Sequence, residues 1–186
     1  MSSTTTANSL GLTPGTWNID PVHSTVSFSV RHMMVSKVRG NFKQFSGAIT
    51  VGETIEQSSV NATIVASSVD TGNEQRDGHL RSADFFNVES TETLEFVSKS
   101  VSAKGGDWIV AGDLTVNGVT KPVDLTVEFS GVGPDGQGGQ KAGFEASTVL
   151  DRKDFGVEFN MPLEGGGVVI GDKITITLDI EADLAR

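Results

Sequence analysis

Apolar and polar residues alternate along most of the chain from Trp17 onward, a pattern typical of β-strands that bury one face. In the stretch HSTVSFSVRH, Val26, Phe28 and Val30 share one face of the predicted strand, and serine and arginine side chains occupy the other. The same period returns near residues 38–51, 60–66, 94–96, 108–116, 123–129, 144–150 and 174–180. The fold class is therefore predicted to be all-β, with about eight to ten antiparallel strands.

Two local signals indicate how strands connect or bend. Asn117 and Gly118 stand between two valines, and Asn-Gly is a strong hairpin signal because both turn positions need a positive φ. The inward-facing residues change parity near Lys43 or Gln44, so we expect a β-bulge that bends the strand there.

The segment Asp70 to Phe86 lacks the period of two. It predicts one short helical segment near 74–86, with the helix itself around 75–82, and this segment is expected to act as a lid or plug.

Closure of the sheet is expected because an open antiparallel sheet of this length exposes two edges. Small residues on the predicted inner faces leave space inside, namely Gly40, Gly47, Ala62, Ala66, Gly112 and Ala146. We therefore favour an extended, hollow barrel that could hold one small ligand. A solid β-sandwich is the alternative, since the pattern alone does not separate the two architectures.

Length and composition limit the remaining possibilities. The 186 residues suit one domain, expected over 14–186, and residues 1–13 are small and polar and predict a disordered tail. The 24 acidic and 14 basic residues give a net charge of -10, which disfavours nucleic-acid binding. No apolar run reaches the roughly 20 residues that span a bilayer, so no stable membrane insertion is expected. The start of the sequence lacks the features of a signal peptide, which predicts a cytoplasmic protein.

Signals for catalysis and metal binding are weak. Cysteine is absent, and His23, His32 and His79 do not form a metal-binding motif, so we predict no metal site. No GxSxG motif is present and no catalytic triad can be argued from spacing, so we predict no enzymatic activity. An enzyme that uses His32 or His79 as a general base on a hydrophobic substrate is kept as an alternative.

Basic residues beside apolar ones stand out in this acidic chain. They either pair with the surrounding acids or form a polar mouth that holds the head group of an amphipathic lipid. The predicted head-group residues are His32, Arg39, Arg76, His79 and Arg152. The predicted apolar lining consists of Val26, Phe28, Val30, Phe42, Phe45, Ile49, Ile64, Phe85, Phe86, Phe96, Trp108, Leu114, Leu125 and Phe144.

Several segments, taken in order, resemble one known family. They are WNIDPVHSTVSFSVRH, GNFKQFSGAI, VDTGNEQRDGHLRSADFF, GDLTVNGVTKPVDLTV, DRKDFGV and GDKITITLDIEA, and they extend from Trp17 to Ala182. This set resembles the YceI-like family, also called polyisoprenoid-binding. The resemblance implies an extended lipocalin-like barrel, usually dimeric, with a long cavity that holds a polyprenyl chain or a similar amphiphile. Many members carry a secretory signal, which is not visible in this sequence.

We therefore predict a protein that binds, sequesters or transports a long-chain amphiphilic lipid, either a polyisoprenoid or a molecule like an isoprenoid quinone. The lipid is the expected ligand, no cofactor is expected, and the resemblance predicts a homodimer. The alternatives are the histidine-dependent enzyme and a solid β-sandwich that serves as an interaction module without a ligand.

Overall fold

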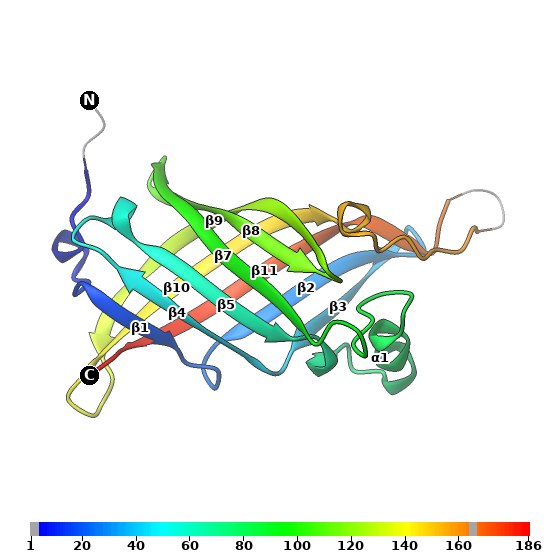
Figure 1. The fold of residues 1–186 in the computed structure, drawn as a ribbon, viewed down its shortest axis with the longest axis horizontal. Helices are drawn as coiled ribbons and strands as arrows, with labels where there is room; N and C mark the ends of the chain where they lie inside the picture. Colours follow the sequence, from blue (N-terminus) through cyan, green and yellow to red (C-terminus); the bar gives the residue numbers. More distant parts are fainter. Residues whose placement is uncertain (1–3, 164–166) are drawn as a thin grey trace.

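Eleven antiparallel strands form one continuous sheet in the computed structural model, which describes residues 4–163 and 167–186 (Figure 1). The strands are β1 (Gly15–Ile19), β2 (Thr25–His32), β3 (Ser36–Phe42), β4 (Phe45–Val51), β5 (Ser59–Val65), β6 (Val69–Asp70), β7 (Thr93–Lys104), β8 (Asp107–Val116), β9 (Val119–Pro134), β10 (Gln140–Asp151) and β11 (Ile170–Leu184). Eight of them, β1, β4, β5 and β7 to β11, close into a ring because β11 pairs with both β10 and β1. The predicted all-β barrel is confirmed.

The sheet continues beyond the ring along β11. The C-terminal half of this strand pairs with β1 through Ala182 and Leu184, and its N-terminal half pairs with β2 from Asp179 to Ile170. β3 and β6 follow β2 in the sheet. The barrel is therefore elongated, and its β2–β3 end lies opposite the two chain termini (Figure 1).

The predicted bulge near Lys43 is a corner between two strands. β3 ends at Phe42 and β4 begins at Phe45, so the change in parity marks a break in the strand and not one inserted residue. The backbone N–H of Lys43 donates to the Ser68 carbonyl (3.1 Å), and that of Gln44 donates to Ser68 Oγ (3.0 Å). Ser68, in the 3₁₀ turn η3 (Ala66–Ser68), thus accepts the hydrogen bonds of two backbone N–H groups at the corner between the strands.

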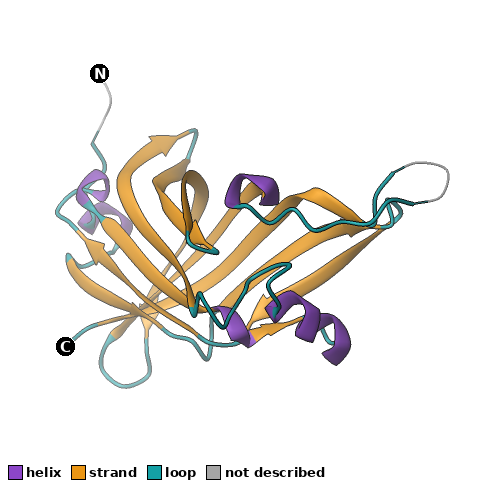
Figure 2. Cartoon of the chain, turned by 45° about the vertical axis from the view of Figure 1, so that its right-hand side comes forward, coloured by secondary structure: helices purple, strands orange, loops and turns teal. Residues whose placement is uncertain are grey.

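Helical segments lie around the ends of the strands (Figure 2). The predicted helix is present as α1 (Glu74–Arg81), which begins where the Asn73 side chain accepts a hydrogen bond from the Arg76 N–H (2.9 Å). The other short turns are η1 (Asn8–Leu10), η2 (Ile55–Gln57) and η4 (Arg152–Phe155).

The prediction of a disordered tail is wrong for residues 4–13. The N–H of Ala7 donates to the Glu53 carbonyl and the N–H of Ile55 to the Thr5 carbonyl, both at 3.0 Å. Ala7 is 0% exposed and Leu12 is 3% exposed, and both join a core cluster around Trp17. The segment covers the end of the barrel through long-range contacts, which a search for periodic apolar faces cannot detect. Residues 1–3 lie outside the described part of the chain.

The Asn-Gly turn is confirmed, and it allows a stability test. Asn117 and Gly118 have φ values of 53° and 76°, and the flanking Val116 and Val119 pair. We expect Gly118→Val to lower the free energy of unfolding by more than about 1 kcal/mol, because a β-branched residue is strained at positive φ. Urea denaturation measures the loss. Gly133→Val is the control, since Gly133 has space for a side chain and no positive φ. Equal urea midpoints for the Gly118→Val variant and the wild type would refute the assignment.

Candidate functional site

An apolar cavity of about 520 Å³ runs along the inside of the barrel, and every strand of the closed ring contributes to its lining. This volume lies in the range of small-molecule sites. At one end the lining includes Leu10, Leu12 and Ile55, and at the other it includes Met161 and Ile170. The alternative of a solid β-sandwich is therefore wrong. The cavity has the shape and chemistry to hold an apolar chain.

The structure brings all fourteen predicted lining residues to this cavity, and their role as ligand contacts stays a prediction. Aromatic rings form part of the wall, with ring centroids of Phe28 and Phe42 5.7 Å apart and those of Phe42 and Phe86 5.5 Å apart. The full set is Val26, Phe28, Val30, Phe42, Phe45, Ile49, Ile64, Phe85, Phe86, Phe96, Trp108, Leu114, Leu125 and Phe144.

The inner glycines do not leave empty space in the way that the sequence suggested. A Cβ atom on Gly40 would lie 2.6 Å from Phe28 Cζ, and one on Gly112 would lie 2.6 Å from Phe96 Cζ. Rings from the adjacent strands fill the positions that side chains would take. These glycines therefore allow bulky rings to lie close to the wall of the barrel.

Arg39 does not reach the cavity. It pairs with Ser29 across β2 and β3, whereas its neighbours Val38 and Gly40 pair with the inward-facing Val30 and Phe28. Arg39 lines a separate pocket near Asp70 on the outer face. Strand alternation thus places Arg39 outside the cavity, away from the position that its predicted role as a head-group residue requires.

Arg152 borders the cavity, but its guanidinium binds the protein itself. The side chain is buried, and its Nε donates to the Gly171 carbonyl (2.9 Å) and its Nη1 to the carbonyls of Val157 (3.0 Å) and Phe159 (2.8 Å). Burial lowers the pKa of Arg152, and the nearby Asp172 opposes this shift. Arg152 therefore holds the loop after η4 against β11, and few of its donors stay available for a ligand.

Arg76 and His79 place two further basic side chains of α1 at the cavity. Arg76 Nε donates to Thr71 Oγ1 (2.7 Å), and its Nη2 donates to the Thr71 carbonyl (2.9 Å). The His79 ring bonds through Nε2 to Asp84 Oδ2 (2.9 Å) and stands edge-on to Phe85 and Phe159, with centroid distances of 5.0 and 4.8 Å. His79 thus connects α1 to the loop after η4.

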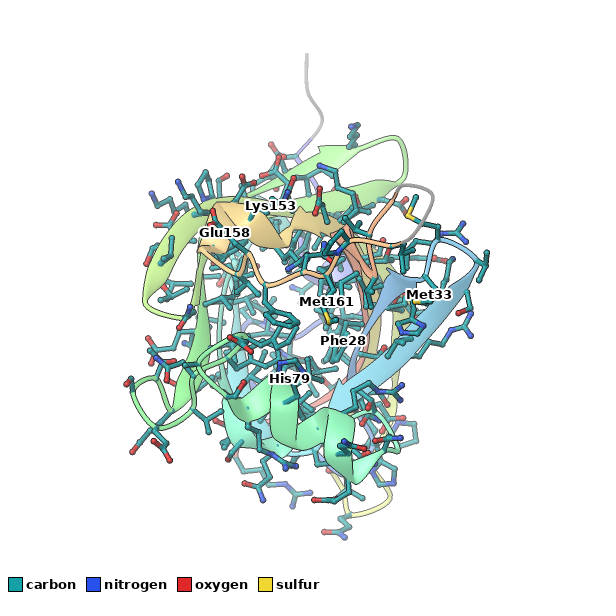
Figure 3. The ribbon with its side chains drawn as sticks, turned by 90° about the vertical axis from the view of Figure 1, so that its right-hand side faces the viewer. Phe28, Met33, His79, Lys153, Glu158 and Met161 are labelled. Carbon is teal, nitrogen blue, oxygen red and sulfur yellow. The ribbon has the colours of Figure 1, made fainter. Side chains whose placement is uncertain are left out.

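His32 is a third basic residue at the end of the cavity that Arg76 and His79 border, and we call this end the mouth of the cavity. It lies at the end of β2 and also borders the cavity. Figure 3 looks along the barrel from this side, where Phe28, His79 and Met161 lie around its centre. The predicted lid segment 70–86 includes α1 at the mouth, and its opening stays a prediction.

The loop after η4 supplies lining residues that the sequence analysis missed. Val157, Phe159 and Met161 border the cavity and alternate with polar Glu158 and Asn160. The signal was the same period of two that predicted the strands. Leu10 and Leu12 were also missed, because they belong to the segment expected to be disordered.

A cluster of charged side chains lies where the chain bends between β1 and β2. Lys141 Nζ is 3.1 Å from Asp20 Oδ2, 3.2 Å from Glu181 Oε2 and 3.0 Å from Asp183 Oδ1. Asp20, His23 and Glu181 have ligand atoms close enough together for a metal ion. We interpret the group as an ion-pair network, because the Lys141 ammonium already supplies the positive charge beside its carboxylates.

Within this network, the contribution of His23 to the stability of the fold is expected to depend on pH. The His23 Nδ1 bonds to Asp20 Oδ2 (2.7 Å), which raises the pKa of His23 above its ordinary 6.5 and holds the pKa of Asp20 well below its usual range. Because the pKa of His23 is raised on folding, its stabilising contribution is fully present below pH 6.5 and is lost as the pH rises through the raised pKa.

We expect Asp20→Asn to return the pKa of His23 towards its ordinary value, as followed by NMR titration of the histidine rings. Glu158→Gln removes an exposed carboxylate elsewhere and serves as the control. An unchanged titration of His23 in the Asp20→Asn protein would contradict the interpretation.

A closed antiparallel barrel around an apolar cavity, with helical and loop segments at its mouth, defines a lipocalin-like protein. The model of the YceI-like domain family matches residues 17–182, and the chain belongs to this family. The UPF0312 protein SERP2314 of Staphylococcus epidermidis is 40% identical over 168 residues, which cover 89% of this chain and 95% of that relative.

Two solved structures share the fold. BcnA of Burkholderia cenocepacia aligns with a TM-score of 0.75 at 23% identity, over 88% of this chain and 98% of that one. A polyisoprenoid binding domain from Saccharophagus degradans aligns with a TM-score of 0.70 at 16% identity, over 91% and 98% of the two chains. No helix in the described part of the chain is long and apolar enough to cross a membrane.

Proposed function

We propose that the barrel binds a long-chain amphiphilic lipid, such as a polyisoprenoid or an isoprenoid quinone, and sequesters or transports it without changing it chemically. The observation that carries this proposal is the cavity of about 520 Å³, whose lining is almost wholly aliphatic and aromatic. The shared fold with a domain described as polyisoprenoid binding supports it.

The two ends of the cavity differ in polarity, which suits an amphiphile. Its inner end is covered by Leu10, Leu12 and Ile55, whereas His32 and His79 border its mouth. An apolar tail therefore fits inside, with its head group at the mouth, where imidazole nitrogens supply hydrogen bonds.

The energetic scale agrees with reversible binding. Burial of about 400 Å² of lipid surface at roughly 25 cal/mol per Å² contributes on the order of 10 kcal/mol. The loss of translational freedom and the ordering of a flexible tail offset much of this gain. Micromolar or tighter affinity follows without a covalent step.

The pair His79 and Asp84 is the observation that favours the enzyme alternative. A carboxylate that orients an imidazole beside a cavity resembles the arrangement of a general base. In that case His79→Ala would leave lipid binding nearly intact and would reduce turnover by a factor of about 10² to 10⁴. The binding proposal expects no lipid conversion by the wild type.

Tryptophan fluorescence tests the proposal, because the two tryptophans differ in position. Trp108 borders the cavity, whereas Trp17 is fully buried in the core cluster at the inner end. Titration of the delipidated protein with a long polyprenol is expected to give a saturable change with a Kd in the micromolar range or below. Trp108→Phe should remove most of the change. A wild type without a saturable response would overturn the proposal.

A further inference from the structure

The hairpin between β2 and β3 ends in three exposed apolar residues beside the mouth. Met33 is 42% exposed, Met34 59% and Val35 82%. The Met33 N–H donates to the Val169 carbonyl (2.8 Å), and the Val169 N–H donates to the carbonyl of Met161, which is itself 56% exposed. Met161 and Val169 border the cavity. We call Met33, Met34, Val35 and Met161 the mouth patch.

The turn is not built from residues that favour it. The Val35 N–H donates to the His32 carbonyl (3.3 Å), which places Met33 and Met34 at the centre of the turn with φ values of 55° and 65°. Such positions favour Asn and Gly, as at Asn117 and Gly118 in the same chain. The two methionines therefore neither favour the conformation of the turn nor add to the buried core, which indicates a role at the surface.

The strands behind the tip carry only positive formal charge. No acidic residue occurs between Asp20 and Glu53, although the whole chain has a net charge of -10. Arg31 and Lys37 are direct partners across β2 and β3, and like charges in this position repel each other. An anionic surface beside the tip would remove this repulsion. Lys153 and Glu158 lie on another side of the mouth (Figure 3).

We propose that the mouth patch docks reversibly on a membrane surface that contains anionic lipids. The four apolar side chains enter the head-group region, and Arg31 and Lys37 face the lipid phosphates. This arrangement turns the mouth of the cavity towards the bilayer. Docking itself does not depend on the ligand, whereas its use in loading a lipid rests on the proposed function.

Flotation with lipid vesicles tests docking directly. The delipidated protein is expected to float with vesicles of phosphatidylcholine and phosphatidylglycerol and much less with phosphatidylcholine alone, and added salt should weaken the binding. Lys37→Glu should reduce the binding more than about fivefold, because each basic residue near such a surface contributes roughly 1 kcal/mol. Lys104→Glu is the control, since Lys104 ends β7 opposite Asp107 of β8, and the β7–β8 hairpin lies far from α1 at the mouth (Figure 1).

The double variant Met33→Asn, Met34→Gly separates docking from folding. Asn-Gly suits the two positive φ values, so the thermal stability should stay equal or rise. Vesicle binding should fall at least tenfold, and polyprenol binding measured by Trp108 fluorescence should be unchanged. Equal vesicle binding by the double variant and the wild type would overturn the proposal. So would a wild type that ignores anionic vesicles and forms a dimer which the double variant dissociates, because the patch would then join two copies.

Discussion

The Phe28→Asp protein is expected to lose at least a hundredfold in lipid affinity while it keeps its fold. The Phe28 ring lies on the cavity wall, against Phe42 and over Gly40. A carboxylate in this position must give up its water when an apolar chain fills the cavity, which costs several kcal/mol. The loss is measured by polyprenol titration, after circular dichroism has shown that the variant is folded.

Two comparisons separate the causes of such a loss. Ser29→Asp adds the same charge to the next residue of β2, which pairs with the outward-facing Arg39, and we expect it to bind lipid like the wild type. His32→Ala removes at most a head-group hydrogen bond, which contributes about 1 kcal/mol between neutral partners, so the expected loss of affinity is about fivefold and well below a hundredfold. Lipid binding by folded Phe28→Asp as tight as in the wild type would exclude the cavity as the site.

Deletion of residues 1–12 is expected to lower the Tm by about 6 to 12 °C. The deletion removes buried Ala7 and Leu12 together with backbone hydrogen bonds to Glu53 and Ile55. Burial of one leucine contributes about 1.5 to 3 kcal/mol and each lost hydrogen bond about 0.5 to 1.5 kcal/mol, so the deletion costs about 3 kcal/mol. In a chain of this length 1 kcal/mol corresponds to about 2 to 4 °C. The segment also covers the inner end of the cavity, so the truncated protein should release lipid faster.

Point variants test whether the packing of buried side chains in this segment causes the loss in Tm. Leu12→Ala should reproduce part of the loss in Tm, and Asn8→Ala should change little because Asn8 is exposed. A truncated protein that melts within about 2 °C of the wild type would instead support a dispensable tail.

The barrel and most of its lining could be predicted because they depend on alternation within single strands. Val26, Phe28 and Val30 face inward, as the alternation of apolar and polar residues predicts, and Asn117 and Gly118 form the expected turn. Arg39 lies outside the cavity because Val38 and Gly40, on either side of it in β3, pair with inward-facing residues, and the alternation in the sequence already indicates this orientation.

Other features depend on contacts that no local pattern describes. Ala7 bonds to Glu53, and Ala7 and Leu12 join a core cluster with residues as distant in the sequence as Ala182. The small and polar residues next to them in the sequence predict disorder because they give no sign of these contacts. Arg152 is occupied by carbonyls of the loop after η4, whose path is set by packing against β11. The turn at Met33 carries neither Asn nor Gly, and only the structure shows its positive φ.

The most direct test of the central claim is mass spectrometry of the purified protein under native conditions, together with analysis of its organic extract. After incubation with vesicles that contain polyprenol, the wild type is expected to carry one lipid per chain, and the extracted lipid should have an unchanged mass. The Phe28→Asp protein should carry none. A wild type without bound lipid would contradict the account, and so would an extract in which the lipid has been converted into a product.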